Sequence, residues 1–165
     1  MVPVQFRQAT VDDAGTLLSI KRAAIGGITS DAYEEAQLAA WQPDAEAVED
    51  FERAIDSETF DAVLASADGT DVAYGVLNVS AGRIDGLYVR PQHSGAGIAT
   101  SLVGQLESRA RMHDIQELEI VSSLNAKSFY QGLDYWDFGS KTMAIDGVEI
   151  EFAIMRKQLG SPAAS

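Results

Sequence analysis

The sequence of 165 residues predicts an α/β protein with a mixed central sheet of about seven strands flanked by helices. Seven short segments bounded by turn residues are typical of strands, and five amphipathic segments are typical of helices. Three strand segments follow one another across short turns, which predicts an antiparallel meander. One strand is reached through a loop and a long helix, which predicts a single parallel crossover. We expect one domain over residues 1–160 and a loose tail at 161–165.

The amino-terminal third predicts one strand and three helices. A strand is expected at 4–9, because apolar and polar residues alternate there. Apolar residues at helical spacing predict a helix that begins after Thr10 and ends at the pair Gly26-Gly27. Two shorter amphipathic patches, 31–41 and 44–55, are separated by a proline and are expected to form two more helices.

The middle of the chain changes to the two-residue period of strands. Strands are expected at 59–67 and 72–80, and the residues Asp68-Gly69-Thr70-Asp71 between them indicate a hairpin turn. After a second turn, 83–89 is expected to be a third consecutive strand. These three segments form the predicted meander.

The last part of the chain contains the clearest helix. Apolar residues fall on one stripe over 98–110, which predicts an amphipathic helix. A strand is expected at 117–121, and a short helix at 125–133. The final two strands, 135–145 and 148–159, flank an Asp-Gly pair that is typical of a hairpin turn.

The composition excludes several kinds of site. Cysteine is absent, which removes disulfides, thiolate zinc sites, iron–sulfur clusters and cysteine nucleophiles. The two histidines, His93 and His113, are far apart in the sequence, so we expect no metal site. Hydrophobic residues make up 46% and charged residues 22%, which is ordinary for a folded domain.

The charge and hydropathy limit the partners that we expect. The net charge of −13 repels phosphate backbones, so no nucleic-acid partner is predicted. No apolar run reaches the roughly eighteen residues that a membrane span needs. The first seven residues lack the basic patch and apolar run of a secretory signal. A cytoplasmic protein without a membrane partner is therefore expected.

The segment Ser94-Gly95-Ala96-Gly97-Ile98-Ala99-Thr100 lies between an expected strand and an expected helix. Glycines let the backbone approach a bulky anion, and the first amides of a helix lack internal partners and carry the positive end of its dipole. The segment therefore indicates a phosphate or pyrophosphate site. The alternative is a plain strand-to-helix turn that needs glycine only for its backbone angles.

Two common phosphate motifs do not fit this segment. A Walker loop requires Lys and then Ser or Thr after its second glycine, where this chain has Ile98 and Ala99. A dinucleotide fingerprint requires a third glycine where Thr100 stands, and it opens directly after a parallel strand. Here a linker with Pro91 follows an antiparallel meander, so neither motif is expected.

Two motifs in the correct order resemble the GNAT N-acetyltransferase family. LYVRPQHSGAGIA at 87–99 resembles its acetyl-CoA signature, and so does NAKSFY at 125–130 followed by LDY at 133–135. The resemblance covers nearly the whole chain. QLAAW at 37–41, together with the closing residues 147–157, is similar to the YafP-type branch of the family.

The resemblance implies the GNAT fold, with a bulge or splay between strands four and five that admits the pantetheine arm of acetyl-CoA. It implies an N-acetyltransferase that transfers acetyl from acetyl-CoA to a primary amine by direct attack on the thioester, without a metal. A small-molecule acceptor is expected. The alternatives are a protein N-terminal or lysine acetyltransferase and a non-catalytic acyl-CoA-binding or sensor module on the same fold. A homodimer is also expected to be possible, because the last strands of such sheets often pair between subunits.

The resemblance assigns cofactor contacts to the end of one strand, the glycine loop and the short helix. Strand backbone would bind the pantetheine amides, and the N–H of Leu87 or Val89 would polarise the acetyl carbonyl. The cofactor-binding residues are then Leu87, Tyr88, Val89, Ser94, Gly95, Ala96, Gly97, Ile98, Ala99, Thr100 and Asn125. Two positions depart from the family pattern: Ser94 stands where Arg or Gln is usual, and Asp134 where Gly is usual.

The resemblance implies that Tyr130 is the acid for the departing thiolate. A phenol has a pKa of about 10 and a thiol one of about 8.5, so complete proton transfer is uphill by about 2 kcal/mol. Tyr130 must therefore act as a positioned donor while charge develops. Without the resemblance, a core aromatic residue beside Phe129 is the simpler interpretation.

Asp85 is the first candidate for the base that deprotonates the amine. It lies two residues before Leu87, so we expect both side chains on the same strand face. A salt bridge to Arg83 is its alternative role. His93, in the loop, is the second candidate, and a reaction without a side-chain base is the third possibility.

Tyr33 and Trp41 are the candidates for binding the acceptor. They lie in the early helical region, and the amine is expected to enter where the early helices meet the last hairpin. The two rings would form an aromatic wall there. The alternative is that they only pack a helix on the sheet.

Overall fold

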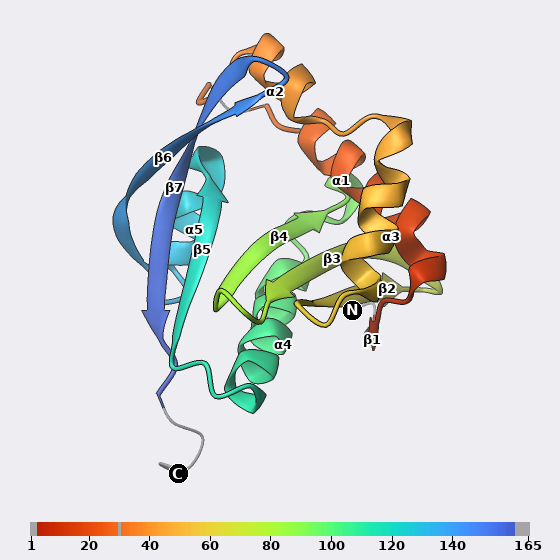
Figure 1. Ribbon diagram of the computed structural model, residues 1–165, viewed down its shortest axis with the longest axis vertical. Helices are drawn as coiled ribbons and strands as arrows, with labels where there is room; N and C mark the ends of the chain where they lie inside the picture. Colours follow the sequence, from red (N-terminus) through yellow and green to blue (C-terminus); the bar gives the residue numbers. More distant parts are fainter. Residues whose placement is uncertain (1–2, 30, 161–165) are drawn as a thin grey trace.

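The computed structural model describes residues 3–29 and 31–160, over which the chain forms a seven-stranded sheet with helices on both faces (Figure 1). The strand order is β1-β2-β3-β4-β5-β7-β6, and only β4 and β5 are parallel. This arrangement confirms the predicted mixed sheet. The strands are β1 (Val4–Gln8), β2 (Phe60–Ala67), β3 (Thr70–Asn78), β4 (Arg83–Val89), β5 (Glu117–Ser123), β6 (Trp136–Ile145) and β7 (Val148–Gln158). The tail expected at 161–165 lies outside the described residues.

The helices form in the predicted order, with four short 3₁₀ turns between elements. The helices are α1 (Ala14–Gly26), α2 (Glu35–Trp41), α3 (Val48–Asp56), α4 (Ile98–Met112) and α5 (Lys127–Gln131), and the 3₁₀ turns are η1 (Val11–Asp13), η2 (Ala45–Ala47), η3 (Pro91–His93) and η4 (Leu124–Ala126). The helix predicted at 31–41 begins only at Glu35. Glu34 is extended and caps it, with its N–H donating to Oε1 of Gln37 at 2.9 Å. No helix in the described ranges is long and apolar enough to cross a membrane.

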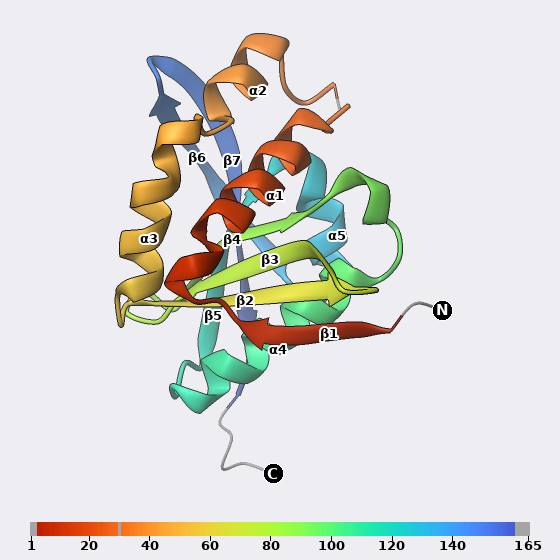
Figure 2. The ribbon, with the colours of Figure 1, turned by 90° about the vertical axis from the view of Figure 1, so that its right-hand side faces the viewer.

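Two hydrophobic clusters cover the two faces of the sheet. Figure 2 shows α1 and α3 over one face of β2 and β3 and α4 over the other. The cluster under α4 includes buried Leu102 and Leu106, whereas the cluster under α1 includes Leu17 and Tyr74. Gly75 lets α4 approach β3, because a Cβ there would lie 2.7 Å from Cδ1 of Leu106. The helix that follows the glycine loop is thus fixed directly against the strands.

Strands β4 and β5 separate after two residue pairs. Arg83 lies opposite Glu119 and Ile84 opposite Ile120, and the two strands have no later pairs. The next residue of β4, Asp85, is a bulge without a partner in β3. The expected splay between the fourth and fifth strands is therefore confirmed.

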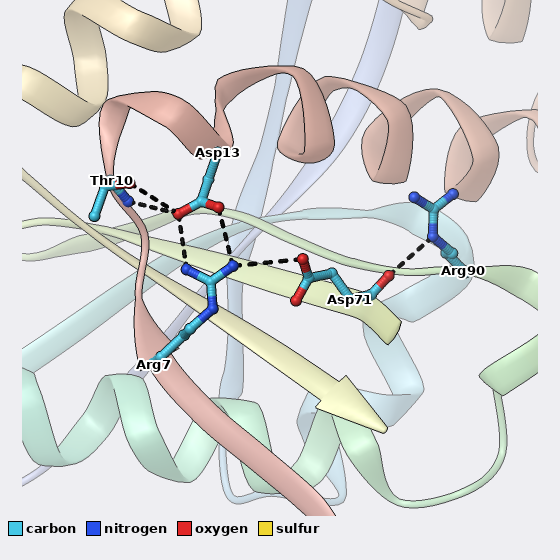
Figure 3. A network of polar contacts seen from close by, with 5 residues as sticks. All are labelled: Arg7, Thr10, Asp13, Asp71 and Arg90. Carbon is cyan, nitrogen blue, oxygen red and sulfur yellow. Dashed lines mark hydrogen bonds and ion pairs between the residues drawn. The ribbon is translucent and has the colours of Figure 1, made fainter. Parts of the chain in front are cut away.

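A polar network joins β1, the start of α1 and the end of β4 (Figure 3). The Arg7 guanidinium donates to both carboxylate oxygens of Asp13, at 2.8 and 2.9 Å, and also contacts Asp71 at 3.4 Å. The Thr10 N–H donates to Asp13 at 2.8 Å, as the predicted capping box requires. Arg90, which leads into the glycine loop, donates from Nε to the Asp71 carbonyl at 3.1 Å. The network therefore holds the end of β4 against the beginning of the chain.

We predict that Asp13→Asn lowers stability at neutral pH and weakens its dependence on pH in acid. The hydrogen bonds from Arg7 and Thr10 lower the pKa of the Asp13 carboxyl from 3.8 to about 2. Because the folded-state pKa is depressed, the stabilisation is present above the ordinary pKa and is lost as the pH falls from about 4 to about 2. Urea unfolding across this range measures the effect.

The control for this prediction is Asp12→Asn, at an exposed neighbour that makes no ion pair within the described ranges. It should keep the acid dependence of the unmodified protein. An Asp13→Asn variant that unfolds in acid with the unmodified slope would show that the network does not stabilise the fold.

Candidate active site

The gap between β4 and β5 contains a narrow cavity of about 60 Å³. Its walls are residues 84–88 of β4 and 120–123 of β5, together with Trp41 of α2, Ala126 of η4 and Tyr130 of α5. The paired residues lie at the beginning of β4 and in the middle of β5, so the gap widens toward the end of β4, where the glycine loop starts. A gap of this shape accepts a thin, extended ligand.

Two backbone N–H groups of β4 point into this gap. The Arg90 amide donates to the Val72 carbonyl at 2.8 Å, on the β3 side of the strand. Because donor directions alternate along a strand, Tyr88 also donates toward β3, whereas Leu87 and Val89 direct their N–H groups toward β5. Strand β5 has already diverged at this level, so these two donors have no partner in the sheet.

The loop after β4 presents six consecutive amides without an acceptor in the described structure, those of residues 95–100. The first amide of α4 that does bond is Ser101, whose N–H donates to the Gly97 carbonyl at 3.1 Å. Gly95 and Gly97 have φ of +80° and +81°, and a Cβ on either would meet nothing within 4 Å. Glycine is therefore needed for the backbone direction, and space is left for a ligand. An open helix N-terminus of this kind suits a bulky anion.

The two departures from the family pattern have local explanations. The Ser94 hydroxyl donates to the Pro91 carbonyl at 2.9 Å, so it bonds within its own loop. Asp134 has φ of +73°, in the left-handed region that favours glycine, and aspartate tolerates this region better than most residues. The turn before β6 therefore keeps the backbone angle that a glycine would adopt.

Tyr130 is buried at the edge of the gap with its hydroxyl unbonded within the described chain. Its ring packs edge-on against Phe129 and Tyr135, with centroids 5.0 and 5.9 Å away. Burial raises the pKa of the Tyr130 phenol, and the nearby Tyr88 raises it further. The phenol is therefore protonated at neutral pH and can donate a hydrogen bond into the cavity.

The bulge places Asp85 on a different face from the one predicted. Its carboxylate accepts hydrogen bonds from Arg83 and from Nδ2 of Asn78, the latter at 3.1 Å, so it lies on the α1 face of the sheet with Tyr88. Leu87 packs against the cluster under α4, on the opposite face. The expectation that Asp85 and Leu87 share a face is wrong, because a bulged residue interrupts strand alternation. The salt bridge to Arg83 is present, and Asp85 also lines the gap.

Trp41 and Tyr33 occupy different surroundings. Trp41 lines both the gap and a larger groove, with its ring centroid 6.4 Å from that of Tyr88. Tyr33 is buried behind Trp41 and lines neither cavity. Its hydroxyl donates to the Glu151 carbonyl at 2.6 Å and accepts from the Leu124 N–H at 2.9 Å. The packing role that the sequence left open thus describes Tyr33 better than Trp41.

The larger groove, of about 800 Å³, opens on the α1 side of the gap. Trp41, Asp85 and Tyr88 line both cavities, so the groove communicates with the gap at these residues. Sequence reasoning missed Lys21 of α1, which also lines the groove. The missed signal is its spacing, because Lys21 falls on the apolar stripe of the helix four residues after Leu17.

Asn125 and His93 lie outside the cavities described above. Asn125 is exposed in η4, next to Ala126 in the wall of the gap, and His93 is partly buried in η3. Within the described ranges, no group of three or more histidine, cysteine, aspartate or glutamate side chains could hold a metal ion.

Comparisons with known proteins agree with this geometry. The chain matches the model of the acetyltransferase (GNAT) domain family over residues 29–159. No curated protein matches the chain.

Solved structures of similar length match nearly the whole chain. A GCN5-related N-acetyltransferase from Rhodopseudomonas palustris is 27% identical with a TM-score of 0.87, over 93% of this chain and 94% of that one. The PaiA N-acetyltransferase from Thermoplasma acidophilum, in complex with coenzyme A, is 21% identical with a TM-score of 0.74, over 94% and 99%. YncA from Salmonella typhimurium, with its cofactor acetyl-CoA, is 17% identical with a TM-score of 0.69, over 98% and 96%. Membership of the YafP-type branch stays a prediction.

Proposed function

The chain belongs to the GNAT acetyltransferase family, and we propose that it transfers an acetyl group from acetyl-CoA to a primary amine of a small molecule. The observation that carries this proposal is the convergence of unpaired donors on one gap. The N–H groups of Leu87 and Val89 and the hydroxyl of Tyr130 face it, and the six free amides of residues 95–100 follow at its wide end.

These groups fit the parts of acetyl-CoA. The amides of residues 95–100 suit the diphosphate, because an unpaired helix N-terminus binds anions. The narrow gap suits the pantetheine arm, whose amides would bond with the β4 backbone. The thioester would then lie near Leu87, Val89 and Tyr130, with its carbonyl oxygen toward a free N–H. No metal takes part in this proposal.

The reaction requires a neutral amine, stabilisation of the negative charge on the acetyl oxygen, and a donor for the departing sulfur. The neutral amine attacks the thioester carbon, and an N–H of Leu87 or Val89 stabilises the negative charge that develops on oxygen. The new C–N bond forms and the C–S bond breaks, and the proton that the attacking nitrogen loses as the amide forms passes, directly or through water, to the departing sulfur. Tyr130 then donates to the departing sulfur, as a positioned hydrogen-bond donor because burial makes it a weaker acid than a free phenol.

The amine must lose a proton before it attacks. Asp85 is the proposed acceptor of this proton, directly or through water, because it lines both the groove and the gap. His93 lines neither cavity, which makes it the weaker candidate. Proton loss to solvent through the open groove, without a side-chain base, is the remaining route.

We also propose that two copies of the chain associate through β6. This strand lies at the edge of the sheet, so one side of its backbone is unpaired. Trp136 and Phe138 on this strand are 47% and 49% exposed, and their ring centroids are 5.2 Å apart. A second β6 edge would pair the free backbone and cover both rings.

We predict that Tyr130→Phe lowers turnover at least about tenfold while coenzyme A affinity changes little, because only the hydrogen bond to the departing sulfur is lost. Thiol release with an amine panel and calorimetry with coenzyme A measure the two quantities. The control is Tyr135→Phe, whose hydroxyl instead donates to buried Glu107 at 2.8 Å. This control should lose thermal stability and keep its turnover. Full turnover in Tyr130→Phe would remove the residue from the mechanism.

We predict that Gly97→Asp weakens coenzyme A binding at least about tenfold, whereas Gly97→Asn weakens it much less. Both side chains tolerate the left-handed angle at this position and enter open space, so the pair differs mainly in charge. Calorimetric titration measures the ratio of the two dissociation constants. Equal affinities would place the diphosphate away from this loop.

We predict that the unmodified protein is a dimer in solution and that the double variant Trp136→Ser, Phe138→Ser is a monomer. Light scattering behind gel filtration gives the mass of each. A monomeric unmodified protein, or a dimeric double variant, would contradict pairing through β6. Thermal melting of the double variant serves as the folding control. We expect it to be folded, because neither ring belongs to the buried core.

A further inference from the structure

Lys21 is a partly buried cation without a counter-ion. It lies four residues after Leu17 on the stripe of α1 that faces the sheet, and Leu17 is buried in the cluster under α1. No carboxylate of the described chain forms an ion pair with Lys21, and burial lowers the pKa of its ammonium group. A desolvated cation without a partner is unfavourable in the free protein, so an anion that reached it would bind favourably.

Aromatic rings are the only close partners that the described structure gives this ammonium group. Nζ lies 5.5 Å from the ring centroid of Tyr88 and 6.0 Å from that of Phe51. A cation–π contact at such distances replaces only part of the lost hydration. It also leaves N–H groups of the ammonium available to a ligand.

Two cavities meet at Lys21. The groove of about 800 Å³ shares Lys21, Phe51 and Tyr88 with a smaller pocket of about 220 Å³ under α3. The smaller pocket is otherwise lined mainly by apolar side chains, including Leu17, Ile55, Phe60 and Val76. A ligand in this position would place an apolar group in the pocket and an anionic group at Lys21.

Two acidic residues line both cavities, and each has a cationic partner. Asp85 is paired with Arg83, and Asp50 with Arg53. Both acids line the groove and the pocket, yet neither pairs with Lys21. The groove is also lined by Asp44, Glu46 and Asp146, and within the described ranges none of these carboxylates forms an ion pair with Lys21.

We propose that Lys21 binds the carboxylate of the acceptor and that the acceptor is an amino acid with an apolar side chain. This inference rests on the proposed acetyl transfer. The side chain occupies the pocket under α3, the carboxylate contacts Lys21, and the amine faces Asp85 at the opening of the gap. The products are the N-acetylated amino acid and coenzyme A, with the amine proton passing to Asp85 or water.

The first test compares L-phenylalanine with phenethylamine, which lacks only the carboxylate, and L-leucine with 3-methylbutylamine. The unmodified protein should have the higher kcat/KM for each amino acid. Lys21→Met keeps the length of the stem and removes the charge, so the ratio of amino acid to amine should fall at least about tenfold, mostly through KM. Arg22→Met removes a charge from the exposed side of the same helix and should leave the ratio nearly unchanged. An unmodified protein that prefers the amines, or a Lys21→Met variant with an unaltered ratio, overturns the proposal.

The second test is binding, which does not depend on turnover. L-phenylalanine and L-leucine are titrated into the coenzyme A complex, and each should bind the unmodified protein at least about tenfold more tightly than Lys21→Met. Absence of binding to the unmodified protein overturns the proposal. Acetylation of the amines alone would overturn this inference and leave the proposed function intact, whereas amino-acid binding without any acetyl transfer would overturn only the proposed function. Because Lys21 has no counter-ion, Lys21→Met should melt no lower than the unmodified protein, and a large drop would identify a structural role instead.

Discussion

The site depends on two neighbouring strands that stop pairing while each keeps its other neighbour. Strand β4 remains bonded to β3, and all seven residues of β5 pair with β7. The two halves of the sheet therefore keep their own hydrogen bonds. The missing bonds are confined to one seam, which is the gap between β4 and β5. Backbone donors in a folded protein normally have partners, so the free amides of the half-buried residues Leu87 and Val89 in this seam are available to acceptor groups of a ligand. The same seam opens toward the glycine loop. The donors of β4 and the free amides of the loop can therefore bind one extended ligand.

Side chains hold the two halves together where backbone bonds are absent. Tyr88 on β4 contacts Trp41, and Trp41 contacts Phe152 on β7 with a centroid distance of 5.2 Å. Tyr33 adds hydrogen bonds to β7 and to η4. The region around α2 thus bridges the seam from the groove side. Any acceptor in the groove meets the same aromatic residues that keep the seam at its width.

Local patterns in the sequence predict the order of the elements, because periodicity and turn residues are properties of short segments. The capping box at Thr10 and the hairpins are examples. The separation of β4 from β5 came only from the family resemblance, since no local pattern reports which strands fail to pair. The bulge at Asp85 escaped prediction because it exists only relative to β3. The hydroxyl bonds of Tyr33 depend on partners more than ninety residues away, so its spacing could not reveal them. Lys21, in contrast, could have been found from its place on an apolar stripe.

The bulge also makes the register of β4 against β3 a property that the site must conserve. The hairpin from β3 sets the start of the strand, and the extra residue at Asp85 shifts every later side chain by one position. If the bulge were straightened with all residues kept, Asp85 would pair with Val76, so that Tyr88 would turn toward α4 and Leu87 toward the groove. The free amides would reverse direction as well, because donors alternate with side chains. Straightening the bulge would therefore exchange the inside and outside of the seam without any change in the composition of the strand.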